Sequence, residues 1–174
     1  MNDLGKLTGD YVLDTARTRI GFVARHTMAT RVRGRFEEFE GGAYLDGDHP
    51  SKSSAHLTIR ADSIETRNRG RDDMLRDKFL DAAGHPAITF TSTEVRQVDE
   101  TAFKVTGDLV IRGASRPVTV DVEVTDAEDE GRIGFRGGVT INRMDWGVNW
   151  NAATTATVGK KVRVEFEVTA IRRP

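Results

Sequence analysis

The chain has 174 residues, of which 37% are apolar and 30% charged, and its formal net charge is -1. This length suits a single domain, because two independent cores would leave each half small. The balanced charge excludes an overall electrostatic field that would draw the protein onto nucleic acid or an anionic membrane. The absence of Cys excludes disulfides, thiol catalysis and thiolate metal sites.

Residues 1–10 read as an N-terminal tail, and residues 11–174 as one domain. The first residues contain no apolar stretch typical of a secretory signal. No apolar run in the chain is long enough to span a bilayer. We therefore expect a soluble, cytoplasmic protein without stable membrane insertion.

Alternation of apolar and polar residues with a period of two runs through most of the domain. This pattern predicts strands that bury one face, and β-branched residues are abundant on that face. Turn-forming residues separate the segments, and Asp99-Glu100 predicts a hairpin. Loops are also expected at 46–51, 113–117 and 126–131, and an irregular stretch at 147–159. The alternating segments, in chain order, are residues 19–25, 54–61, 103–111, 118–124, 132–141 and 162–170.

Residues 66–81 break this pattern. Leu75 and Phe79 are four positions apart and Met74 adjoins them, while Arg and Asp crowd the remaining positions. The spacing predicts a short helix with a narrow apolar stripe.

Long strands with short connections and no βαβ rhythm indicate an all-β, antiparallel fold. Strands with one apolar face need a second sheet or closure into a barrel, and closure removes exposed edges. We predict an antiparallel β-barrel of about eight strands, with the short helix in the 66–81 region.

The apolar faces contain many small residues, and bulky aromatic residues are few. Small side chains would leave the barrel underfilled, and a dry cavity costs stability, on the order of 24 cal/mol per Å³. A hydrophobic ligand would recover that loss. The alternative is that small residues lie where strands bend or cross. The small residues concerned are Ala24, Ala55, Ala61, Gly107, Gly137 and Ala170.

Several motifs occur in an order that resembles the YceI-like family. They include RIGFVARH at 19–26, GDLVIRG at 107–113 and INRMDWG at 141–147. Similar segments lie at 32–41, 71–81, 85–93 and 158–162, so the resemblance extends from about Tyr11 to the C-terminus.

This resemblance implies a lipocalin-like barrel whose apolar interior binds a polyisoprenoid or an isoprenoid quinone. It implies no cofactor, and it leaves a homodimer open, although no interface is legible in the sequence. Burial of an isoprenoid tail is favourable by about 0.8 kcal/mol per CH₂. The candidate ligand-binding residues are Ile20, Phe22, Ala24, His26, Ala55, Leu57, Ile59, Met74, Leu75, Phe79, Ile88, Phe90, Leu109, Ile111, Phe135, Trp146 and Val164.

Three polar or aromatic features have two interpretations each. His26 shares a face with Ile20 and is either a structural residue or a contact to a ligand head group. Arg71 and Asp72 are expected to pair with the loop of residues 143–145, as a structural contact or as a polar gate. Trp146 either plugs one barrel end or stacks on a quinone ring.

Other chemistries find little support in the sequence. His49, His56 and His85 have no zinc-ligand spacing, so we expect no metal site. The Arg residues at 67, 69 and 71 adjoin Asp residues and lack interleaved aromatic residues, which disfavours nucleic-acid binding.

Three function classes follow. The favoured class is non-catalytic binding of a long apolar lipid, as a carrier, store or buffer. The second is an enzyme that acts on a bound lipophile with His26 or Asp145 as the base. The third is a structural or stress-response protein with a solid core.

Overall fold

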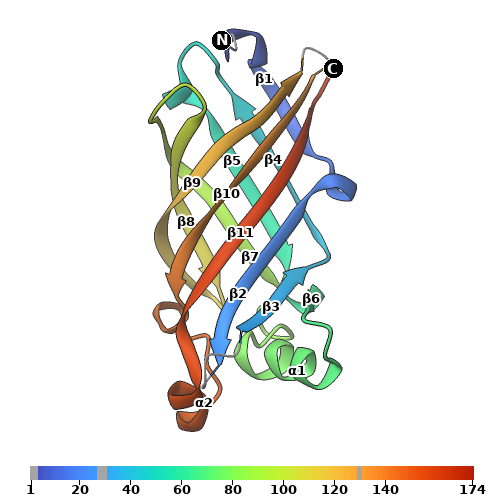
Figure 1. The fold of residues 1–174 in the computed structure, drawn as a ribbon, viewed down its shortest axis with the longest axis vertical. Helices are drawn as coiled ribbons and strands as arrows, with labels where there is room; N and C mark the ends of the chain where they lie inside the picture. The colour runs from blue at the N-terminus through green and yellow to red at the C-terminus, as the bar shows by residue number, and fades with distance from the viewer. Residues whose placement is uncertain (1–3, 27–30, 129–130) are drawn as a thin grey trace.

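The computed structural model describes residues 4–26, 31–128 and 131–174, which form a tall β-barrel with short helices at its two ends (Figure 1). The strands are β1 (Gly9–Leu13), β2 (Arg19–His26), β3 (Arg31–Phe36), β4 (Phe39–Leu45), β5 (Ser54–Arg60), β6 (Ile64–Glu65), β7 (Ala87–Gln97), β8 (Ala102–Ile111), β9 (Ala114–Glu128), β10 (Arg132–Asn142) and β11 (Val158–Arg172). The helices and helical turns are η1 (Leu4–Leu7), η2 (Thr15–Arg17), η4 (Pro50–Lys52), η5 (Ala61–Ser63), α1 (Arg69–Met74), η6 (Leu75–Phe79), η7 (Arg143–Trp146) and α2 (Ala152–Thr157).

Eight of the described strands close into a ring of antiparallel neighbours in the order β1-β4-β5-β7-β8-β9-β10-β11, with β11 paired back to β1. The 15-residue strand β11 makes this closure possible because it has two partners along one edge. Its first part pairs with β2 and its last part with β1. Strands β3 and β6 continue the sheet beyond β2. The predicted antiparallel barrel of about eight strands is confirmed.

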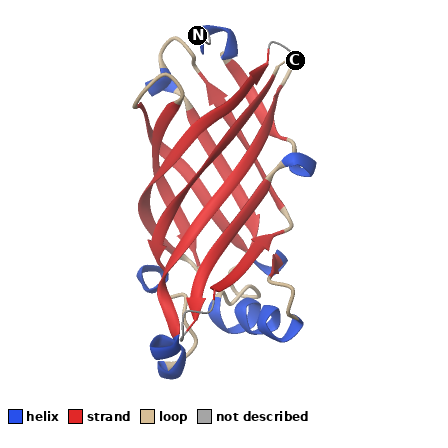
Figure 2. Ribbon diagram, viewed as in Figure 1, coloured by secondary structure: helices blue, strands red, loops and turns tan. Residues whose placement is uncertain are grey.

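The two ends of the barrel differ (Figures 1 and 2). Both chain termini lie at one end, which we call the termini end. Elements α1, η6, η7 and α2 lie at the other, which we call the helical end. Of the helices that the structure describes, none is both long and apolar enough to cross a membrane.

The predicted helix in the 66–81 region is confirmed as α1 followed by the π-helical turn η6. Asn68 caps it, since its side chain accepts a hydrogen bond from the Arg71 N–H. Leu75 and Phe79 both line the barrel interior, as their spacing on one face requires.

Three predicted loops are wrong in part. The loop expected at 126–131 is shorter, because β9 continues to Glu128. The stretch 147–159 contains helix α2, because Asn151 and Thr154 form a reciprocal capping box at its start. The loop expected at 113–117 shortens to a tight turn, and β9 begins at Ala114. Arg112 and Gly113 make this turn with φ values of 52° and 78°, which the two-residue connection of a hairpin requires.

The N-terminal segment before residue 11 joins the barrel where it is described. Gly9 and Asp10 belong to β1, and Leu7 is 8% exposed within an apolar cluster at the termini end. A second and larger apolar cluster extends toward the helical end and includes Trp146.

Candidate functional site

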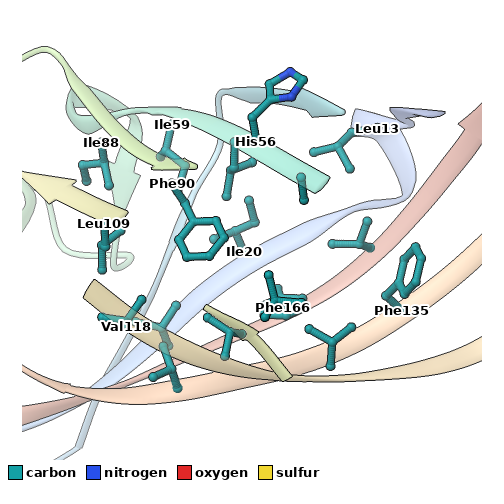
Figure 3. Close-up of a pocket in the computed structure, with 18 of the residues that line it drawn as sticks. Leu13, Ile20, His56, Ile59, Ile88, Phe90, Leu109, Val118, Phe135 and Phe166 are labelled. Atoms are coloured by element: carbon teal, nitrogen blue, oxygen red, sulfur yellow. The ribbon is translucent and has the colours of Figure 1, made fainter. Parts of the chain in front are cut away.

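A cavity of 410 Å³ occupies the barrel interior. Its walls are almost entirely apolar, because the inward positions of each strand alternate with outward polar ones. Figure 3 shows apolar side chains from several strands, among them Ile20, Phe90 and Phe135, converging on this space. The imidazole of His56, an exposed residue, points away from them.

Most of the candidate ligand-binding residues line this cavity. Met74 and Trp146 are not among the described lining residues. The side chain of His26 lies outside the part of the structure that is described, although its backbone ends β2. The candidates that line the cavity are Ile20, Phe22, Ala24, Ala55, Leu57, Ile59, Leu75, Phe79, Ile88, Phe90, Leu109, Ile111, Phe135 and Val164.

Sequence reasoning missed further lining residues of two kinds. Phe103, Val139 and Phe166 lie on the apolar faces of expected strands, so the period-two pattern alone would have found them. Leu7 and Leu13 lie in short elements without a clear period, and no pattern in the sequence marks them.

Small residues in the wall have two different roles. Ala24 and Ala55 line the cavity directly, as expected for an underfilled barrel. Gly107 does not leave a gap, because a Cβ there would lie 2.5 Å from Cζ of Phe90. A Cβ on Gly137 would collide with the backbone carbonyl of Asp121 and would lie 2.9 Å from Cζ of Phe166. These glycines allow phenylalanine rings to lie against the wall and leave the middle of the barrel free.

The termini end is fastened by a hydrogen-bonded group around Tyr11, which is 2% exposed. Its hydroxyl donates to the Leu7 carbonyl at 2.8 Å and accepts from Nη2 of Arg172 at 3.0 Å. The guanidinium of Arg172 also lies 5.6 Å from the centre of the Tyr11 ring. These contacts hold η1 over the barrel, with Leu7 facing the cavity. Polar lining residues also lie near this end, including Asp46 and Ser53, which join through Asp46 N–H donating to Ser53 Oγ at 2.9 Å.

The helical end is organised by Arg143, which lines the cavity and is 4% exposed. Its guanidinium donates to backbone carbonyls, at 2.6 Å to Val148, 2.8 Å to Val158 and 3.0 Å to Gly159. It also lies 5.7 Å from the centre of the Phe79 ring. Burial lowers the pKa of Arg143 from its ordinary value. The side chain joins η6, the loop after η7 and the start of β11 into one unit.

Two more side chains close this end. Nη1 of Arg112 donates to the carbonyls of Gly147 at 2.7 Å and Asn149 at 2.9 Å. The indole N–H of Trp146 donates to the Leu109 carbonyl at 2.8 Å, and the residue is 4% exposed. Trp146 therefore fills the helical end of the barrel as part of the apolar core.

Arg71 and Asp72 do not pair with the 143–145 loop as expected. Both bind Thr66: Arg71 Nε donates to its Oγ1 at 2.8 Å, and Asp72 accepts from its N–H at 2.8 Å and from its hydroxyl. Thr66 is the nearer partner because it lies only three residues before the start of α1. Asp145 is exposed, and its backbone carbonyl accepts from Arg116.

The model of the YceI-like domain matches residues 11–170. The chain belongs to the YceI-like family. A UPF0312 protein from Pseudomonas aeruginosa is 29% identical over 174 residues, which cover 96% of this chain and 89% of that protein.

Solved YceI-like structures share this fold. BcnA from Burkholderia cenocepacia aligns with a TM-score of 0.84 at 26% identity, covering 90% of this chain and 98% of BcnA. A polyisoprenoid binding domain from Saccharophagus degradans, implicated in plant cell wall breakdown, aligns with a TM-score of 0.77. At 19% identity over 94% of this chain and 98% of that domain, this second likeness concerns the fold alone.

Proposed function

We propose that this YceI-like protein binds one long apolar lipid inside its barrel, as a carrier, store or buffer, without catalysis. The observation that carries the proposal is the apolar cavity, which has lining residues from both barrel ends, Leu7 at one and Arg143 at the other. A wall of this kind suits a ligand that gains its affinity from burial of CH₂ and CH₃ groups rather than from hydrogen bonds.

The proposed ligand class is a polyisoprenoid chain or an isoprenoid quinone. The family supports this class, and so does the shared fold of the polyisoprenoid binding domain from Saccharophagus degradans. Each buried CH₂ contributes about 0.8 kcal/mol, so a tail of many carbons needs few polar contacts for tight binding. The enzymatic alternative loses Asp145 as a base, because that residue is exposed and is not among the described lining residues.

The direct test is organic extraction of the purified protein followed by mass spectrometry. We expect a long-chain apolar lipid in stoichiometric amount, or uptake of an isoprenoid quinone by protein stripped of lipid. Protein that yields no lipid and takes up no quinone would contradict the proposal. A cytoplasmic location and a homodimer remain predictions, for which fractionation of the source cells and light scattering are the respective tests.

A further inference from the structure

Five cations gather on the outer wall near the helical end, where β3, β2 and β11 run side by side (Figure 1). All five residues are exposed. We call them the basic cluster. It consists of Arg25, Arg31, Arg33, Lys160 and Lys161.

Strand register brings these residues together from three separate parts of the chain. Arg25 on β2 is paired directly with Arg31 on β3. On its other side, the register of β11 shifts between Val158 and Val162, so that residues 159–161 all lie opposite Arg25. Lys160 and Lys161 are both in this bulge. The fold thus places four cations around one point of the wall, with Arg33 two residues further along β3.

The described part of the chain offers none of the five an ion-pair partner. Acidic neighbours on the same strands already have partners. Glu165 pairs with Arg163 at 3.7 Å, and Glu65 pairs with Arg35 at 3.2 Å. The connection between β2 and β3, residues 27–30, contains no acidic residue in its sequence. The nearly neutral whole chain therefore carries a local excess of positive charge.

Such a cluster does not help the barrel to fold. Like charges directly opposite each other on paired strands destabilise a sheet, and Arg25 with Arg31 is such a pair. The cost is recovered when an anionic surface approaches, because its charge neutralises several of the cations together. An external anionic partner thus explains why the cations are placed opposite one another.

An exposed indole lies at the same end of the barrel. Trp150 is 48% exposed and lies two residues before α2, which leads into the strand that carries Lys160 and Lys161. The other tryptophan, Trp146, is buried. Exposed Trp together with Lys and Arg is typical of protein surfaces that rest at the interface between water and lipid.

We infer that the helical end docks on anionic phospholipid bilayers through the basic cluster and Trp150, and that the protein collects or releases its lipid there. The inference rests on the proposed function, since the long apolar lipid proposed as the ligand resides in membranes. A nucleic acid is the poorer partner, because the outward residues Val23 and Gly21, which precede Arg25 on β2, give bases no ring to stack on. Trp150 is a single ring rather than a row of stacking side chains.

The test is co-sedimentation with phosphatidylcholine vesicles prepared with and without phosphatidylglycerol. We expect binding to the anionic vesicles only, with loss at high salt. Lys160→Gln/Lys161→Gln lowers the partition constant by about 25-fold, because each cation near such a surface contributes roughly fivefold. The matched control is Lys52→Gln/Arg173→Gln, which removes the same charge from exposed positions elsewhere and leaves binding unchanged.

Tryptophan emission locates the contact. The chain has two tryptophans, so a blue shift on vesicle addition that is lost in Trp150→Phe places Trp150 in the bilayer interface. Equal binding by both charge variants, or binding to DNA but not to vesicles, would overturn the inference. Quinone uptake from ethanol stock is measured in parallel. Uptake without vesicle binding refutes the docking alone, whereas vesicle binding without uptake refutes the proposed function.

Discussion

The ring of Phe22 on β2 lies directly over Gly34 on β3, and the two residues are paired in register. A Cβ on Gly34 would collide with Cζ of this ring and would lie 2.9 Å from Cγ2 of Thr66. Phe166 is likewise paired with Gly137 and its ring lies near that glycine, although the first atom a Cβ would meet there is the backbone carbonyl oxygen of Asp121. An inward glycine opposite an inward phenylalanine therefore sets the width of the cavity. Without a Cβ on the glycine, the ring can lie along the wall instead of projecting from it.

Gly34→Ala is expected to push the Phe22 ring into the cavity and to reduce the amount of lipid that the protein takes up. The neighbours of the new methyl group are side-chain atoms of Phe22 and Thr66, which can move, so we expect a stability loss of about 1–3 kcal/mol, typical of overpacking. Quinone uptake at saturation and urea denaturation measure the two effects.

The double variant Gly34→Ala/Phe22→Leu provides the control. Leucine is shorter than the phenylalanine ring, so uptake should return toward the wild-type level. If uptake stays low in the double variant, the ring of Phe22 does not control the width of the cavity.

Period-two alternation was sufficient to predict six of the eleven described strands, namely β2, β5, β8, β9, β10 and β11, together with their inward faces. It succeeds there because most inward residues, such as Leu57 between His56 and Thr58, alternate with outward polar ones on a wall with water outside. It did not single out the remaining five strands. The helix at 66–81 was also predictable, from the spacing of Leu75 and Phe79.

The contacts that close the barrel ends could not be predicted in this way. Arg143 binds carbonyl oxygens, which every residue carries, so nothing in the sequence marks its partners. Helix α2 depends on a capping box at Asn151 rather than on a periodic spacing of apolar residues. The role of Gly137 depends on strand register, which places Phe166 opposite it and which a single sequence does not specify.

Ala24→Trp and Ala55→Trp are expected to block the cavity, because both residues line it and a large ring would occupy the ligand's volume. Lipid uptake should fall by tenfold or more, while the thermal midpoint changes far less. Glu40→Trp, at an exposed position of β4, is the control and should bind normally. Unchanged uptake in both cavity variants would mean that the ligand does not occupy these positions.

Arg143→Met is expected to cost about 3 kcal/mol or more, because it leaves several buried carbonyls without donors. Arg143→Lys keeps the charge but lacks the planar guanidinium with its several N–H donors, so it should recover only part of the lost stability. Urea denaturation measures both. Arg96→Met, at an exposed position, should change the free energy of unfolding by no more than about 0.5 kcal/mol. Equal effects at the two positions would show that the carbonyl contacts of Arg143 contribute nothing to stability.

Tyr11→Phe removes the hydroxyl that joins Leu7 to Arg172 and keeps the aromatic ring. We expect a loss of about 1–2 kcal/mol in the free energy of unfolding, because the buried Leu7 carbonyl loses its donor. Tyr44→Phe is the matched control, since the chain has two tyrosines and Tyr44 is 38% exposed. Hydrogen exchange at the N-terminal amides should also become faster in Tyr11→Phe. Identical denaturation curves for the two variants would show that the hydroxyl does not fasten η1 to the barrel.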